Sequence, residues 1–131
     1  MSTKIAIAHY PPTFDLARQS TDAAKLYRGQ WRELGRSFDA RVIELTQDDN
    51  LDEILCSLRA KPILFHPKGK IPLSQFRQPK GRALYLFGPE DREIDAAFLD
   101  RFTSVRITTA EDYPLWGTVA AGIALANRWR R

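Results

Sequence analysis

Two short segments of the sequence carry residue types that suit the binding of a small molecule. Residues 82–90, Arg-Ala-Leu-Tyr-Leu-Phe-Gly-Pro-Glu, are an apolar run that stops at a Gly-Pro turn bearing a carboxylate. Residues 115–125, Leu-Trp-Gly-Thr-Val-Ala-Ala-Gly-Ile-Ala-Leu, are a short loop that leads into a run of small apolar residues. A strand end and a helix start that each contain a glycine are places where α/β proteins expose backbone groups to a ligand. The pair predicts a small-molecule site at the carboxyl edge of a sheet.

Common catalytic and nucleotide-binding motifs are absent from the sequence. It has no Walker phosphate loop, no GxGxxG fingerprint and no Gly-x-Ser-x-Gly elbow. The two histidines, His9 and His66, lie far apart and have no clustered partners that would suggest a zinc site. This pattern favours a reaction that depends mainly on positioning, such as group transfer from an already activated donor.

Positive charge is concentrated in the middle of the chain. The formal net charge is +4, and no acidic residue occurs between Glu53 and Glu90. Basic residues recur in that gap, interleaved with Phe65, Phe76 and His66, a pattern that attracts a phosphate backbone. The alternative is a solvated loop of a basic protein. The residues predicted to contact nucleic acid are Lys61, Lys68, Lys70, Arg77, Lys80 and Arg82.

The composition is that of one globular domain. The chain has 131 residues, of which 44% are hydrophobic and 27% charged. No apolar run approaches the roughly 18 residues that span a bilayer, and the N-terminus lacks the layout of a signal peptide. The one cysteine, Cys56, cannot form an internal disulfide, which fits a reducing compartment such as the cytoplasm. Cys56 lies near Ile54, Leu55 and Leu58, so we expect it to be packed in the core.

Strand-like and helix-like patterns alternate along the chain. Short apolar runs predict strands at residues 4–10, 41–45, 62–65, 83–87 and 104–108. Apolar residues at helical spacing predict helices at 15–36, 51–59, 95–101 and 118–129, with one helical turn at 72–76. Gly29 is a position where the first helix could split, and Asp49 or Asn50 is expected to cap the second. This order predicts an α/β fold with a mostly parallel sheet and helices on both faces.

Three predicted strand ends face the same way in any parallel arrangement. They are followed by residues 66–69, 88–90 and 108–110. Ligands of open α/β sheets bind at such carboxyl ends, so these three loops are the candidate site.

The residues at these strand ends resemble motifs of the SPOUT-class RNA methyltransferases, in particular the small tRNA ribose 2′-O-methyltransferases. Residues 84–90 (Leu-Tyr-Leu-Phe-Gly-Pro-Glu), 105–107 (Val-Arg-Ile) and 119–125 (Val-Ala-Ala-Gly-Ile-Ala-Leu) look like the second and third motifs of that class. Residues 62–69 (Pro-Ile-Leu-Phe-His-Pro-Lys-Gly) match the loop before its basic segment. More weakly, residues 5–12 followed by Arg18 resemble the first motif. The resemblance covers essentially the whole chain.

The resemblance implies one SPOUT-like domain over residues 1–131, with a C-terminal part threaded into a trefoil knot. It implies a homodimer to which the last helix contributes, although packing within one subunit is the alternative. It also implies methylation of a tRNA or rRNA ribose with S-adenosylmethionine, with Arg18 favouring the ribose alkoxide electrostatically. The cofactor would be held mainly by backbone groups. The residues so implied are Phe65, His66, Phe87, Gly88, Pro89, Glu90, Ile107, Leu115, Trp116 and Thr118.

The sequence departs from that family in two places. Residues 12–18 are one residue shorter than the first motif and lack its asparagine and glycine. Pro114 and Trp116 stand where the third motif usually has Ser-x-Asn. The alternative function is therefore a degenerate SPOUT-fold protein that binds RNA or a protein partner without methylating; a flavodoxin-like ligand-binding domain is a third interpretation. Gly88-Pro89 as a plain turn and Arg18 as a solvent-facing helix residue also stay open.

Overall fold

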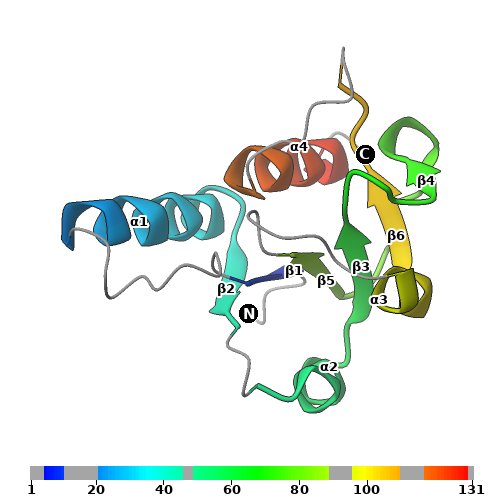
Figure 1. Cartoon of the computed structure of the whole chain (residues 1–131), viewed down its shortest axis with the longest axis horizontal. Helices are drawn as coiled ribbons and strands as arrows, with labels where there is room; N and C mark the ends of the chain where they lie inside the picture. Colours follow the sequence, from blue (N-terminus) through cyan, green and yellow to red (C-terminus); the bar gives the residue numbers. More distant parts are fainter. Residues whose placement is uncertain (1–4, 11–20, 46–48, 89–95, 110–116, 130–131) are drawn as a thin grey trace.

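The protein is built around a single parallel β-sheet (Figure 1). The structure, a computed structural model, describes residues 5–10, 21–45, 49–88, 96–109 and 117–129. The sheet order is β2-β1-β5-β3-β6-β4, and every pairing between neighbours is parallel. The strands are β1 (Ile5–His9), β2 (Ala40–Glu44), β3 (Lys61–Phe65), β4 (Ile71–Pro72), β5 (Ala83–Phe87) and β6 (Thr103–Arg106).

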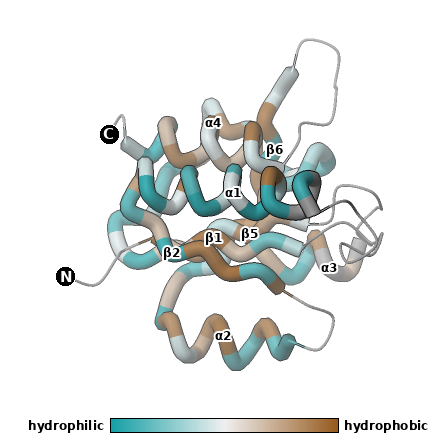
Figure 2. Tube along the Cα trace, turned by 90° about the vertical axis from the view of Figure 1, so that its left-hand side faces the viewer, coloured by the Kyte–Doolittle hydropathy of each residue, from teal (hydrophilic) through white to brown (hydrophobic). Residues whose placement is uncertain are grey.

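Helices cover both faces of this sheet. Those of the described residues are α1 (Thr21–Ser37), α2 (Leu51–Leu58), α3 (Ala96–Arg101) and α4 (Gly117–Trp129), with a 3-10 turn at Leu73–Gln75. α1 and α4 pack on one face, whereas α2 and α3 pack on the other (Figure 2). Within the described ranges, none of the helices has the length and apolar character needed to cross a membrane. The predicted fold class, a mostly parallel sheet with helices on both faces, is confirmed.

The central strand β5 shows why the strands are continuous apolar runs in the sequence. Its five residues are all buried. Ala83, Tyr85 and Phe87 pack toward α1 and α4, while Leu84 and Leu86 pack toward α2 and α3. Side chains alternate between the two faces of a strand, so a sheet covered on both faces needs apolar residues at every position.

Two local features differ from the sequence-based expectation, and one matches it. α1 continues without a break through Gly29 because Trp31 and Leu34, which follow it, hold the helix against the core. The two-residue strand β4 has no counterpart among the predicted strands, since so short a strand has no detectable periodicity. The cap of α2 is Asn50, one of the two predicted residues, and its Oδ1 accepts hydrogen bonds from the backbone N–H groups of Asp52 and Glu53.

The predicted burial of Cys56 is wrong. Cys56 is exposed on α2. Leu51, Ile54, Leu55 and Leu58 form the apolar stripe of this helix and pack against the sheet. At about 100° per residue, position 56 falls on the side of the helix opposite the middle of that stripe. A residue that is next to apolar residues in the sequence therefore need not lie on the apolar face of the helix.

Candidate active site

The carboxyl ends of four strands meet at one edge of the sheet (Figure 1). Phe87 at the end of β5 is in register with His9 of β1 and with Phe65 of β3. Phe65 is in turn in register with Val105 of β6. The chain segments that follow these strands therefore leave the sheet side by side, which confirms the convergence predicted for the three loops.

Two phenylalanines close the core beneath this edge. The rings of Phe65 and Phe87 are stacked, with centroids 5.3 Å apart and planes 13° apart. Both side chains are buried and belong to the core that faces α1 and α4. Their rings are therefore part of the core that supports this edge.

The loop after β3 is fastened to β6 through backbone groups. The N–H of His66 donates to the carbonyl of Val105 at 3.0 Å. The guanidinium of Arg106 donates to the carbonyls of Gly69 and Lys70 at 3.0 and 3.2 Å. Gly69 lies so close to β6 that a Cβ added there would stand 2.4 Å from the carbonyl carbon of Val105. Only glycine permits this approach, so the loop has one fixed position against β6.

The other residues implied to hold a cofactor lie in several environments. Gly88 is half-buried and directly follows β5, and Ile107 is half-buried just after β6. Thr118 lies in the first turn of α4, where its hydroxyl donates to Oε1 of Gln30 at 3.2 Å. The structure brings Phe65, His66, Phe87 and Gly88 to one edge and links Thr118 to α1. Predicted site residues outside the described residues are Arg18, Pro89, Glu90, Leu115 and Trp116.

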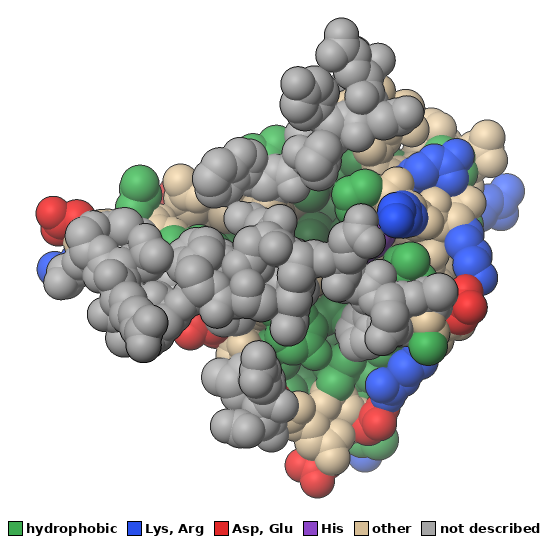
Figure 3. Space-filling view, in the orientation of Figure 1, with side chains coloured by type: hydrophobic (Ala, Val, Ile, Leu, Met, Phe, Trp, Pro, Cys, Tyr) green, Lys and Arg blue, Asp and Glu red, His purple; other side chains and the backbone are tan. Residues whose placement is uncertain are grey.

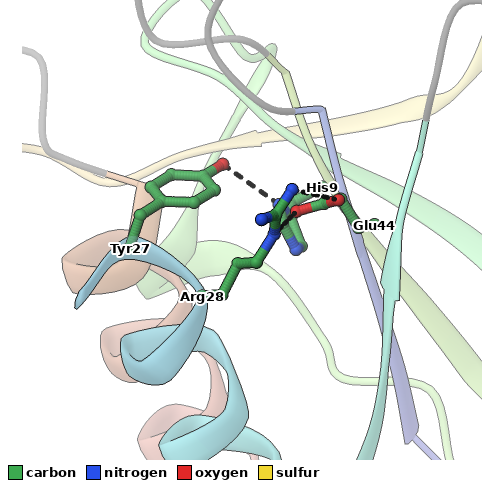
Figure 4. Close-up of polar contacts among 4 residues, drawn as sticks. All are labelled: His9, Tyr27, Arg28 and Glu44. Atoms are coloured by element: carbon green, nitrogen blue, oxygen red, sulfur yellow. Dashed lines mark hydrogen bonds and ion pairs between the residues drawn. The ribbon is translucent and has the colours of Figure 1, made fainter. Parts of the chain in front are cut away.

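A second polar cluster, centred on His9, lies at the same edge and was not predicted from the sequence. His9 ends β1 and is only 2% exposed. Its ring stacks on Trp31 at a centroid distance of 4.3 Å, and its Nδ1 lies 3.2 Å from the hydroxyl of Tyr27 (Figure 4). Burial lowers the pKa of His9 to about 4, although the carboxylate of Glu44 opposes that shift. The imidazole is therefore neutral at pH 7. The available sequence signal was the i, i+4 spacing of Tyr27 and Trp31, which places both on one helix face.

An ion pair lies beside this histidine. Arg28 of α1 donates to both carboxylate oxygens of Glu44 of β2, at 3.2 and 3.4 Å (Figure 4). Both residues line a groove between α1 and β2 with a volume of about 560 Å³. In the described part of the chain, no three His, Cys, Asp or Glu side chains gather in a way that could hold a metal ion.

Comparison with known proteins gives a match at the level of structure. No protein-family model matches the sequence, and no curated protein does. One similar solved structure comes from work on the 2-OH methylation of C/U34 on tRNA, with a TM-score of 0.73 and 17% identity, covering 96% of this chain and 89% of that one. Another is a proposed RNA methyltransferase from Bacillus anthracis, with a TM-score of 0.62 and 16% identity, covering 96% and 92%.

The chain therefore shares its fold with these two solved structures. Both matches extend over nearly the whole of each chain, so the similarity includes the sheet and its covering helices. The sheet edge described above therefore belongs to a fold that this chain shares with both structures.

The predicted basic segment reaches opposite edges of the sheet. Lys68 and Lys70 follow β3 at the carboxyl edge, whereas Lys61 and Arg82 stand at the amino ends of β3 and β5. The N–H of Lys61 donates to the carbonyl of Arg82 at 3.0 Å. A connection between two parallel strands must return along the whole strand, roughly 16 Å for five residues. One run of basic residues therefore cannot form one compact patch.

The carboxyl-edge members of this segment join a mixed surface. In Figure 3, Lys and Arg side chains gather along the edge where β4, β6 and α3 lie, with acidic side chains between them. The ammonium of Lys70 lies 2.7 Å from the carboxylate of Asp100. Its charge is thus partly compensated.

The rest of the segment is attached to α4. Gln78 donates to Oδ1 of Asn127 at 2.9 Å, and Arg128 donates to the carbonyls of Pro79 and Gly81 at 2.8 and 3.0 Å. These bonds hold the exposed Lys80 beside the end of α4. The neighbouring Arg77 is also exposed.

Proposed function

We propose that this protein is an S-adenosylmethionine-dependent RNA methyltransferase that acts on the ribose 2′-oxygen of a tRNA or rRNA. The observation that carries this proposal is the convergence of the loops after β3, β5 and β6 at one edge of a methyltransferase fold. That edge carries the residues that resemble the cofactor-binding motifs.

The residues at this edge fit such a cofactor. A ligand would approach the backbone closely at Gly88, which has no side chain and is half-buried directly after β5. Ile107 contributes apolar surface for an adenine ring. His66 and Phe87 would contribute main-chain carbonyls, each of which can accept a second hydrogen bond beside the one it accepts within the protein. Main-chain groups of Pro89 and Glu90 would complete the contacts. When bound, S-adenosylmethionine supplies a methyl group activated by its sulfonium for direct displacement.

RNA recognition in this proposal falls to the basic residues and Arg18. Lys68 and Lys70 lie closest in sequence to the cofactor loops and would hold phosphates near the transferred methyl group. Lys61, Arg77, Lys80 and Arg82 would extend contact along the chain of the RNA. Arg18 would favour the alkoxide form of the target ribose.

A homodimer and a trefoil knot are part of the same proposal. Large apolar side chains are exposed on the two helices that pack together on one face: Leu26 on α1, and Val119 and Ile123 on α4. A second subunit would remove this surface from water. Light scattering after gel filtration would measure the mass, and a monomer at every concentration would contradict the dimer. The single cysteine supports a cytoplasmic location.

Calorimetric titration with S-adenosylhomocysteine tests the cofactor assignment. We expect wild-type protein to bind and Gly88→Val to lose at least tenfold in affinity, because a branched side chain would occupy the space beside the backbone. Gly81→Val is the matched control, since Gly81 is exposed and a Cβ added there meets no atom within 4 Å. Equal affinity of wild type and Gly88→Val would refute this site.

Mass spectrometry of RNA incubated with cofactor separates the enzyme from the degenerate alternative. A methylated ribose is expected. RNA that is bound but never methylated would favour the binding protein that lacks activity. That result would agree with the departures at Pro114 and Trp116 from the third motif.

A further inference from the structure

The groove between α1 and the edge strand β2 has an unusual lining. Ala40, Val42 and Glu44 alternate along β2 on the side that faces α1. A Cβ added to Gly35 of α1 would lie 2.7 Å from Cγ2 of Val42 and 2.8 Å from the carbonyl oxygen of Ala40. The helix and the strand therefore touch at Gly35, and the groove has an apolar floor.

The exposed wall of the groove is a row of arginines. Arg28, Arg32 and Arg36 all line it and follow one another at i, i+4 and i+8 along α1. This spacing places the three side chains on one side of the helix, roughly 6 Å apart along its axis. The separation is similar to that of successive phosphates in an RNA strand.

Two of these arginines keep most of their charge available. Arg28 is paired with Glu44, the one acidic residue among the groove-lining residues. Arg36 has only a solvent-exposed contact with Glu33, at 3.9 Å, and such a pair is weak. Within the part of the chain that the structure describes, Arg32 has no ion pair. The groove is therefore electropositive along the Arg32–Arg36 side.

The groove also leads to the candidate cofactor edge. Glu44 at one end of it is in register with His9, and His9 is in register with Phe87. Arg36 lies toward the other end, near Ala40. A strand held along the arginine row would thus point from the amino side of the sheet to the edge where the methyl donor is proposed to bind.

We propose that the groove lined by Arg28, Arg32 and Arg36 binds the phosphodiester backbone of the RNA substrate, as a contact surface separate from residues 61–82. This inference rests on the proposed function. All three cations are arginines, whose planar guanidinium groups match phosphate oxygens in geometry and hydrogen bonding. An acidic protein segment would meet the same charges, but the path to the cofactor edge favours RNA.

The test measures binding of a short fluorescein-labelled oligouridylate by fluorescence anisotropy over a range of salt concentrations. We expect the double variant Arg32→Gln/Arg36→Gln to bind about tenfold more weakly. The slope of log affinity against log salt should fall by about 0.7 for each phosphate of the single strand that the variant no longer neutralises. Arg59→Gln is the control for the single variants Arg32→Gln and Arg36→Gln, because it removes one positive charge, as each of them does, from an exposed position after α2 on the opposite face.

The possible outcomes separate this inference from the proposed function. If wild type binds the RNA and the double variant has the same affinity and the same salt slope, the RNA-binding role of the groove is wrong, and the proposed function is unaffected. Wild-type protein that binds no RNA would overturn both. Competition by polyglutamate as effective as that by unlabelled oligouridylate would overturn the assignment to RNA. Unchanged affinity for S-adenosylhomocysteine and an unchanged melting temperature would show that the variant is folded.

Discussion

The loop at residues 66–70 and the groove between α1 and β2 reach the same edge of the sheet but are built in opposite ways. The loop is held through its own main-chain groups, which bond to the main chain of Val105 and to the guanidinium of Arg106, and by the missing side chain of Gly69. The groove consists of exposed charged side chains above an apolar floor. The loop should therefore tolerate almost no change in shape, whereas the groove should tolerate changes that alter only its charge. This contrast agrees with the proposed roles, in which a rigid loop helps to hold the cofactor and an adaptable surface binds RNA.

Substitution of Gly69 by alanine should produce the largest effect. The added Cβ would stand 2.4 to 2.7 Å from main-chain atoms of Val105 and Arg106, so neither partner can rotate away. We expect a loss of about 3 kcal/mol or more in the free energy of unfolding, measured by urea denaturation.

Gly29→Ala is the matched control for this prediction. Gly29 lies inside α1, and a Cβ added there meets no atom within 4 Å. The control should be neutral or stabilise the protein by up to about 1 kcal/mol, because alanine has the higher helix propensity. Comparable stability of the two variants would show that the loop is less constrained than its contacts indicate.

Acid should lower the free energy of unfolding of the protein through His9, the buried histidine at the end of β1. The pKa of this buried histidine is lowered from 6.5 to about 4, so the unfolded chain binds a proton at a pH where the folded chain does not. The resulting stability is fully present above pH 6.5 and is lost as the pH falls toward 4. Between pH 7 and pH 5 this group alone should cost about 2 kcal/mol.

His9→Phe isolates that contribution. Phenylalanine can keep the stacking on Trp31 but cannot take up a proton. Urea denaturation at both pH values should therefore show a smaller loss on acidification in the variant than in wild type. If the two proteins lose the same free energy, the imidazole is not the group that titrates. Protonation of carboxylates elsewhere changes the unfolding free energy of both proteins by the same amount, so it cancels in the difference between them.

The fold was predictable from the sequence where a pattern is local. Apolar runs and helical spacing indicate the order of strands and helices, because a sheet covered on both faces imposes those patterns residue by residue. The loops after β3 and β5 are marked by Gly, Pro and aromatic residues that are neighbours in the sequence. The prediction for Cys56 fails because its burial depends on helix phase, which a short helix shows poorly.

The groove as a whole was beyond prediction because its two walls, α1 and β2, are far apart in the chain, although the spacing of Arg28, Arg32 and Arg36 is itself local. Arg28 and Glu44 come from different elements and meet only after β2 pairs with β1 and α1 packs over both. The same reason explains why the basic residues from Lys61 to Arg82 do not form one patch. A count of basic residues along the sequence does not show that the segment between two parallel strands must run from one edge of the sheet back to the opposite edge.

Glu44→Gln should have the smallest effect on stability. It tests most directly whether the groove, unlike the loop at residues 66–70, tolerates a change that alters only its charge. Its ion pair with Arg28 is partly exposed, with 48% of the Arg28 and 33% of the Glu44 side chain accessible, so we expect a change of about 1 kcal/mol or less in unfolding free energy. The substitution removes the acidic residue from the groove lining and releases Arg28 for phosphate. Affinity for the labelled oligouridylate should rise roughly fivefold, since two unit charges 4 Å apart in water interact by about 1 kcal/mol. Glu53→Gln removes the same charge from α2 on the opposite face and should leave affinity unchanged. An equal rise in both variants would mean that net charge governs binding, and the groove would then have no special part in holding RNA.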